Sequence, residues 1–206
     1  MIALVAANLP EFQRWIDNAT RRQIPFATAL ALTRTAKGAR DDVVVGLPQH
    51  FVVRGSRLAQ SIRYKPANKS DWPRPYSVVY TLAEALVLQE LGGIKVPRRR
   101  DLAIPGAGTR PTPETRITAS KRPAAVLARR GYFLGTIKGG VNAGAAAILQ
   151  RVGPERYPLR VAYLLRPRGV VKARLGFAET VRRRVNFTLG AEWLSAMNQA
   201  VKGAKR

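Results

Sequence analysis

The chain has 206 residues and carries 36 Lys and Arg against 12 Asp and Glu, which gives a formal net charge of +24. Its hydrophobic content of 46% is that of a globular protein and excludes a disordered basic tail. The length predicts a single domain over residues 1–206. The lack of cysteine excludes disulfides, thiolate metal sites and cysteine nucleophiles, and fits a reducing cytosol or a particle assembled there.

The positive charge predicts an acidic partner, which can be nucleic acid, an anionic membrane face or an acidic protein surface. No stretch of the sequence approaches the roughly 18 consecutive apolar residues of a membrane span. The first residues also lack the basic region of a signal peptide. We therefore expect no membrane partner, which leaves nucleic acid and acidic proteins as candidates.

Two helical patterns follow one another near the N-terminus. The first begins after Pro10 and places apolar residues on one helix face, at Phe12, Trp15, Ile16 and Ala19. Pro25 then predicts a kink or a second helix, in which the same spacing returns at Phe26, Ala29, Leu30 and Thr33 and runs to about Arg40. Residues 43–45 either continue this helix or begin an extended segment, and Gly46 with Pro48 is predicted to end both options.

The middle of the chain alternates between strand and helix signals. Apolar and basic residues alternate over 61–65, which predicts a half-buried strand that Pro66 ends. Residues 76–88 are apolar but mixed in period, and we favour a strand followed by a short helical piece.

Residues 97–123 are rich in Pro, Gly, Thr and Arg and contain no aromatic residue. Loops longer than about 12–15 residues in compact domains are usually functional or disordered. The composition of this segment therefore predicts an extended Pro-rich arm that contacts a neighbouring subunit. A flexible surface loop is the alternative of equal weight.

The last third of the chain predicts a sheet and then a helix. Short apolar runs at 132–137, 145–152 and 159–165, separated by glycine-containing turns, indicate an antiparallel meander. From Gly176 onward apolar residues recur at steps of four, which predicts a long amphipathic helix: Phe177, Val181, Val185, Leu189, Trp193 and Met197. Together these elements predict an α+β fold, with N-terminal helices and a long C-terminal helix packed on an antiparallel sheet.

Enzymatic chemistry finds little support in the sequence. The acidic residues are scattered without a paired-carboxylate arrangement, and His50 is interpreted as a structural residue. The glycines of 106–108 and 139–144 lack the Lys-Ser/Thr ending of a phosphate loop and are interpreted as turns. A nuclease would need an Asp/Glu/His metal cluster, which the spacing does not suggest. We predict no enzyme, no cofactor and no metal.

Basic residues occur in short clusters along the chain, where they can face either phosphates or the carboxylates of neighbouring subunits. No motif for base-specific reading accompanies them. The candidate contacts to DNA or to an acidic partner are Arg98, Arg99, Arg100, Lys121, Arg122, Arg129, Arg130, Arg166, Arg168, Arg182, Arg183 and Arg184.

Three stretches together resemble one protein family. They are PFATALALTRTA at 25–36; QELGG at 89–93 with Pro97 and LAIP at 102–105; and LQRVG at 149–153 with YPLRVAYLL at 157–165 and the helix at 177–201. This combination resembles the minor tail protein Z, or tail-completion, family of double-stranded DNA bacteriophages, and its third stretch is the most specific. The family's loop often begins with His where this chain has Gln89, so a role tied to that His is not carried over.

The resemblance implies a non-enzymatic virion protein, assembled in the host cytoplasm, that completes the head-proximal end of the tail and helps hold or position the DNA end. It also implies a ring, in which tail symmetry suggests six copies and attachment to a portal permits twelve. The implied partners are further copies of the chain, other tail, neck or portal proteins, and genomic double-stranded DNA. An adaptor of a short-tailed phage and a basic cellular nucleic-acid-binding protein remain the alternatives.

Overall fold

The computed structural model describes residues 13–204 except 15, 18 and 99. The chain divides into two compact units, whereas its length predicts a single domain. The helical unit comprises residues 1–49, 57–84 and 176–206, and the sheet unit comprises residues 50–56 and 85–175. Each unit is therefore built from segments that are distant in the sequence.

The helical unit contains two long helices, α2 (Ile24–His50) and α6 (Phe177–Ala204), and a two-stranded ribbon of β1 (Ile62–Lys65) and β2 (Val78–Thr81). Three short helices complete it: the π-helical η1 (Ala19–Gln23), α3 (Arg57–Gln60) and the 3₁₀-helical η2 (Lys69–Asp71). Ile16 of the first predicted helix is in helical conformation, whereas Phe12 and Trp15 lie outside the described residues.

The predicted end of the second helix at Gly46 and Pro48 is wrong, because α2 continues to His50. The reason lies in its buried face, since Val43 and Leu47 are one turn apart and both are buried. Burying Leu47 stabilises the helix beyond Gly46, and Pro48 removes only one backbone hydrogen bond near the end. Pro25 lies in the first turn of α2, where its missing N–H is tolerated.

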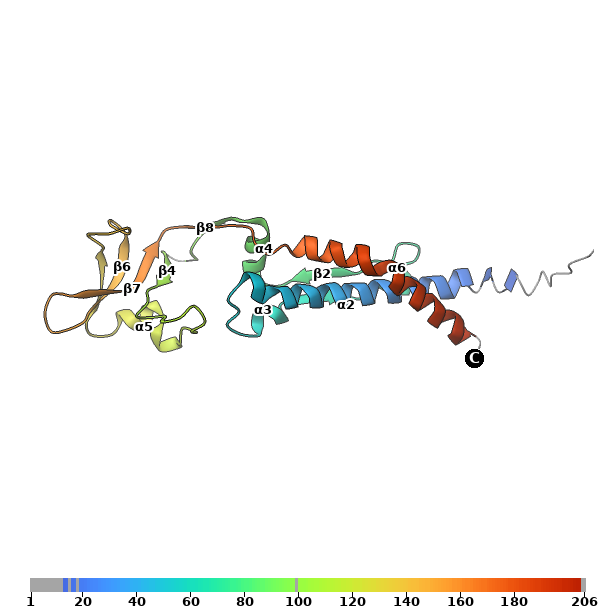
Figure 1. The fold of residues 1–206 in the computed structure, drawn as a ribbon, viewed down its shortest axis with the longest axis horizontal. Helices are drawn as coiled ribbons and strands as arrows, with labels where there is room; N and C mark the ends of the chain where they lie inside the picture. The colour runs from blue at the N-terminus through green and yellow to red at the C-terminus, as the bar shows by residue number, and fades with distance from the viewer. Residues whose placement is uncertain (1–12, 15, 18, 99, 205–206) are drawn as a thin grey trace, which may run out of the picture. The chain divides into compact units, whose positions relative to one another are not determined.

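Helices α2 and α6 lie side by side and antiparallel, as Figure 1 shows. Ala27, Ala31 and Ala196 are buried at their contact, and four larger side chains, together with Ala200, surround these alanines: Leu30, Leu189, Trp193 and Met197. Small residues on facing helices let the two backbones approach closely, so the larger neighbours close the gap around them. The Trp193 indole donates to the Thr28 hydroxyl at 3.2 Å, which fixes the register of the pair.

The β1–β2 ribbon is antiparallel and pairs Ile62 with Thr81 and Lys65 with Val78. Arg40 of α2 donates to the carbonyl of Ile62 at 3.2 Å, and Thr33 accepts from the backbone N–H of Ala67 at 3.0 Å. These bonds hold the ribbon against α2 and bury Ile62. The predicted strand over 61–65 is confirmed, as is the strand followed by a short helix over 76–88, which forms β2 and α4 (Glu84–Leu91).

The sheet unit has a four-stranded antiparallel sheet of strand order β4-β7-β6-β5. Its strands are β4 (Leu102–Pro105), β5 (Tyr132–Thr136), β6 (Ala146–Arg151) and β7 (Leu159–Arg166). A separate pair joins β3 (Gly93–Lys95) to β8 (Gly169–Val171), and two short helices are η3 (Ala119–Lys121) and α5 (Pro123–Leu127). The predicted meander of the last three long strands is confirmed.

One face of the four-stranded sheet carries the core of this unit. Val126 of α5 packs with Ile148, Ala162 and Tyr163, and Ile117 and Leu127 close the cluster from the sides. The α+β prediction with long terminal helices and antiparallel sheets is therefore confirmed, with the long helices in one unit and the four-stranded sheet in the other.

The prediction of an extended arm over 97–123 is wrong for residues 102–105. Leu102–Pro105 forms the edge strand β4, which pairs with β7 through Leu102 and Arg166. After this strand, the buried Thr109 donates its hydroxyl to the carbonyl of Ala162 at 2.9 Å. The few apolar residues of the segment are enough to extend the sheet because β7 offers an unpaired edge.

The alanine contact generates a first prediction. Ala31→Leu adds three carbons where α2 meets α6 and should lower the free energy of unfolding by about 1–3 kcal/mol through overpacking. Ala191→Leu on the exposed side of α6 is the matched control and should change stability by less than about 0.5 kcal/mol. Urea denaturation followed by circular dichroism compares the two, and equal effects would contradict the close approach of the helices.

The core tyrosine generates a second prediction. Burial raises the pKa of Tyr163, and the charge of Arg110 opposes that shift. Because the pKa of Tyr163 is higher in the folded state, the protonated phenol contributes fully to the stability of the fold below the ordinary tyrosine pKa of about 10. This contribution is lost as the pH rises through the folded-state pKa. A near-ultraviolet absorbance titration should therefore show a late-ionising tyrosine that is missing in Tyr163→Phe; an unchanged late phase in that variant would contradict the assignment.

Candidate functional site

The twelve predicted contact residues do not gather at one site. Arg182, Arg183 and Arg184 lie on α6 of the helical unit, and Arg99 lies outside the described residues. The others belong to the sheet unit: Arg98, Arg100, Lys121, Arg122, Arg129, Arg130, Arg166 and Arg168. The basic clusters of the sequence therefore correspond to cations of two separate units and not to one binding site.

On α6 the three arginines have different surroundings. Arg184 forms an ion pair with Asp42 of α2 at 3.2 Å, and Arg182 pairs with Glu179 of its own helix at 3.2 Å. Arg183 is exposed and has no hydrogen-bond or ion-pair partner within the described part of the chain. Arg184 is therefore a structural residue, whereas Arg183 is available to a partner.

Arg184 depends on a glycine of the neighbouring helix. Its guanidinium crosses α2 at Gly38, where an added Cβ would lie only 2.5 Å from Nη2. Its Nε is buried and lacks a hydrogen-bond partner among the residues that the structure describes. The glycine thus makes room for the Arg184–Asp42 pair.

In the sheet unit several predicted cations lie at the two ends of α5. Arg129 donates to the carbonyl of Ser120 at 2.8 Å, which ties the two ends together. Lys121, Arg122 and Arg130 are exposed, and their side chains make no hydrogen bond or ion pair to any described residue. Elsewhere in the unit, Arg166 donates to the side-chain oxygen of Asn142 at 2.9 Å. Arg100 and Arg168 are exposed, and their side chains have no hydrogen bond or ion pair to any described residue.

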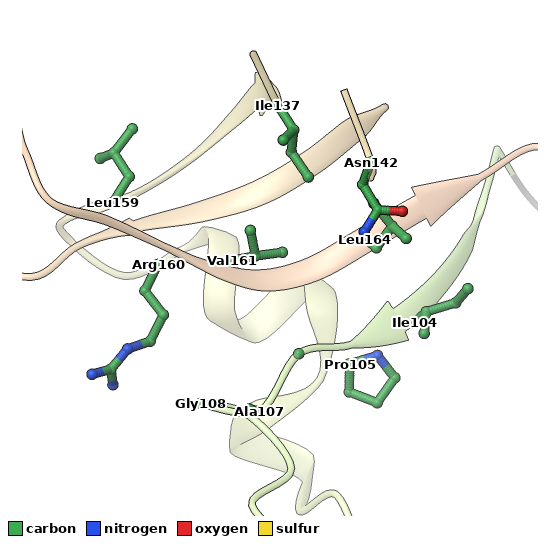
Figure 2. A pocket seen from close by; sticks show the side chains of 11 residues that line it. Ile104, Pro105, Ala107, Gly108, Ile137, Asn142, Leu159, Arg160, Val161 and Leu164 are labelled. Atoms are coloured by element: carbon green, nitrogen blue, oxygen red, sulfur yellow. The ribbon is translucent and has the colours of Figure 1, made fainter. Parts of the chain in front are cut away.

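An apolar groove lies beside the part of β7 that β4 does not cover. It has a volume of about 830 Å³ and is lined by the strand residues Ile104, Leu159, Val161 and Leu164 and by the turn after β4 at 105–108. Figure 2 shows Leu159 and Val161 on one side of β7 and Arg160 on the other, where Arg160 lies near Gly108 and also lines the groove. The backbone of Gly106 touches the Val161 carbonyl so closely that an added Cβ would collide with it.

A second hollow continues along the same strands and shares Ile137, Leu159 and Val161 with the apolar groove. It has a volume of about 440 Å³ and combines three cations, Lys138, Arg151 and Arg156, with the rings of Phe133 and Tyr157. No Asp or Glu lines it. We call this hollow the basic groove.

The cations of the basic groove stack on its rings. The Arg151 guanidinium carbon lies 5.4 Å from the centre of the Phe133 ring, and that of Arg156 lies 5.8 Å from the centre of the Tyr157 ring. Both distances are within the range of a cation–π interaction. Sequence reasoning missed this site because Arg151, at the end of β6, and Arg156, in the β6–β7 turn, stand singly rather than in a run of basic residues.

The helical unit also has a basic hollow, lined by Lys37, Arg40 and Arg63 together with Tyr64. Arg40 is already engaged, since it pairs with Asp41 at 2.6 Å and donates to Ile62. This hollow therefore offers fewer available cations than the basic groove.

Large apolar side chains are exposed on both units. On α6, Phe187 is 80% exposed and Leu194 is 62% exposed, and their spacing of seven residues places them on one helix face. In the sheet unit, Ile94 of β3 and Val170 of β8 are cross-strand partners with exposures of 56% and 81%. Paired exposed side chains of this kind are typical of interaction surfaces.

To hold a metal ion, the described residues would need a set of ligand side chains that lie close together. Over this part of the chain no three His, Cys, Asp or Glu side chains lie close enough to hold a metal ion. His50 is exposed at the end of α2 and makes an edge contact with the Phe51 ring at 6.2 Å. None of the described helices is both long enough and apolar enough to span a membrane.

No protein-family model, no curated protein and no solved structure matches the chain. The resemblance to the minor tail protein Z family therefore stays a prediction from the sequence.

The Gly38 contact generates a third prediction. Gly38→Ala alone should change stability little, because a gain of about 1 kcal/mol in helix propensity is offset by displacement of the Arg184 guanidinium. In an Arg184→Ala background the guanidinium is absent, so Gly38→Ala should raise the free energy of unfolding by close to the full gain in helix propensity of about 1 kcal/mol. A double-mutant cycle by urea denaturation measures the coupling, which should be about 0.5 kcal/mol or more; strict additivity would contradict the contact.

Proposed function

We propose that this protein is a structural subunit of a tailed bacteriophage, which forms a ring at the head-proximal end of the tail and contacts the DNA end and acidic partner proteins. Two exposed apolar surfaces, Phe187 with Leu194 and Ile94 with Val170, carry the proposal together with the charge. The sequence resemblance supplies the phage setting.

The charge supports a partner-bound subunit. Even if every one of the 12 acidic side chains paired with a cation, 24 positive charges would remain. Copies of such a chain repel one another, so a ring gains stability when DNA or acidic neighbours neutralise the excess. Cations with no partner among the residues that the structure describes, such as Arg183 and Arg130, are suited to that role.

The exposed apolar side chains support a protein partner. Phe187 would lose a large apolar area from water on association, at roughly 25 cal/mol per Å² buried. Large aromatic side chains are enriched at the buried centres of interfaces, where they dominate the binding energy. Since cyclic rings join one surface of a subunit to a different surface of the next, two separate apolar surfaces suit that geometry.

A basic cellular nucleic-acid-binding protein is the second candidate function. The basic groove favours it, because cations alternate there with aromatic rings. The exposed apolar pairs on both units are not needed for that function, and they favour the assembly subunit.

Light scattering of the purified protein, alone and with double-stranded DNA or tail and portal proteins, tests the proposal. A discrete species of six or twelve times the 22.6 kDa chain mass is expected for the protein alone, or a larger discrete complex when the tail or portal proteins are added. A monomer that coats nucleic acid, with an affinity that falls steeply with salt, would instead support the second candidate.

Phe187→Glu generates the fourth prediction. The substitution places a carboxylate at the centre of the α6 apolar surface and should abolish the assembled species. Ser195→Glu, also exposed on α6, adds the same charge and should leave assembly intact. Circular dichroism checks that both variants keep their helices, and assembly of both to the same extent would contradict a role of this surface.

A further inference from the structure

We propose that the basic groove binds a short single-stranded segment of DNA, with phosphates on Lys138, Arg151 and Arg156 and bases stacked on Tyr157 and the apolar floor. The choice of DNA rests on the proposed function, because a virion at that position holds the DNA end.

The charge of the groove selects a polyanion. Its lining contains three cations and no carboxylate, and neither Arg151 nor Arg156 makes an ion pair with any residue of the described chain. Both guanidinium groups instead lie over aromatic rings, which hold their planes without neutralising their charge. Oriented, unneutralised guanidinium groups are suited to phosphate oxygens.

The rings and floor of the groove select a single strand over a duplex. Tyr157 is 59% exposed, so its ring is accessible to a base. Gly135 has no side chain, and an added Cβ would lie within 2.9 Å of Leu149 and 3.4 Å of Phe133, so these two apolar side chains cover the floor at Gly135. Bases of a duplex are already stacked on one another, whereas unpaired bases stack on aromatic and apolar surfaces.

The size of the groove agrees with a small flat ligand. Its volume of about 440 Å³ lies within the range of about 300–1,000 Å³ that is usual for ligand pockets. The shared residues Leu159 and Val161 lead from it into the apolar groove of Figure 2, which gives a strand room to continue.

Fluorescence anisotropy with the full-length protein tests the site. The probes are a labelled oligothymidylate, a duplex of equal length and an oligouridylate, each measured over a range of salt concentrations. Oligothymidylate should bind more tightly than either of the other two. Equal binding of the duplex would overturn the single-strand assignment, and equal or tighter binding of oligouridylate would overturn the choice of DNA.

Variants separate stacking from charge. Tyr157→Leu should weaken binding of oligothymidylate about tenfold and leave the duplex unchanged, whereas Tyr157→Phe should retain binding. Arg156→Ala should reduce the slope of log affinity against log salt by about 0.7, the value for one phosphate contact on a single strand. Arg116→Ala removes an exposed cation that does not line the groove and is the matched control. Groove variants that behave like this control would overturn the inference.

Photo-crosslinking supplies a measurement that needs no substitution. A bromouracil-containing oligonucleotide should attach to Phe133 or Tyr157, as identified by mass spectrometry of the peptides, and attachment only elsewhere would overturn the site. A polyglutamate peptide that competes as well as an oligonucleotide of equal charge would assign the groove to an acidic protein instead. Loss of the groove would leave ring assembly unchanged, so failure of this inference is distinguishable by light scattering from failure of the proposed function.

Discussion

The contact between α2 and α6 is the constraint on which the helical unit depends. Ala27, Ala31 and Ala196 are completely buried where the helices meet, so each helix has one inward face. Once this face of α6 is fixed, Phe187 and Leu194 must point away from α2 and stay exposed. The surface that we assign to assembly is therefore a direct result of how the two helices meet.

The secondary structure followed largely from periodicity, but the burial of individual side chains did not. Steps of four predicted α6, and Leu189, Trp193 and Met197 of that series do pack against α2. Phe187 is outside the series, and nothing in a single sequence separates an apolar residue that faces a partner from one that faces the core. Strand β4 was missed because its apolar residues are few and stand between segments rich in Pro and Gly, so only the free edge of β7 stabilises it.

The candidate sites show the same division. Runs of arginine were visible in the sequence, yet Arg184 is used to hold two helices together and Arg129 to join the ends of α5. The basic groove consists of residues from β5 and the segment after it, from β6, from the turn between β6 and β7, and from β7, which are brought together by strand pairing. Only the register of the paired strands shows that these residues lie together, so a search of the sequence for adjacent charges cannot detect the basic groove.

The order in which the two units can form follows from how their segments alternate along the chain. Thr28 and Trp193 are hydrogen-bonded across 165 residues of sequence, and the whole sheet unit lies between them. During synthesis from the N-terminus, the alanine face of α2 has to wait for α6, the last helix, while strands of 85–175 can already pair. The helical unit is thus completed late, after the long intervening loop has been shortened by the folding of the sheet unit, which lowers the entropic cost of closing it.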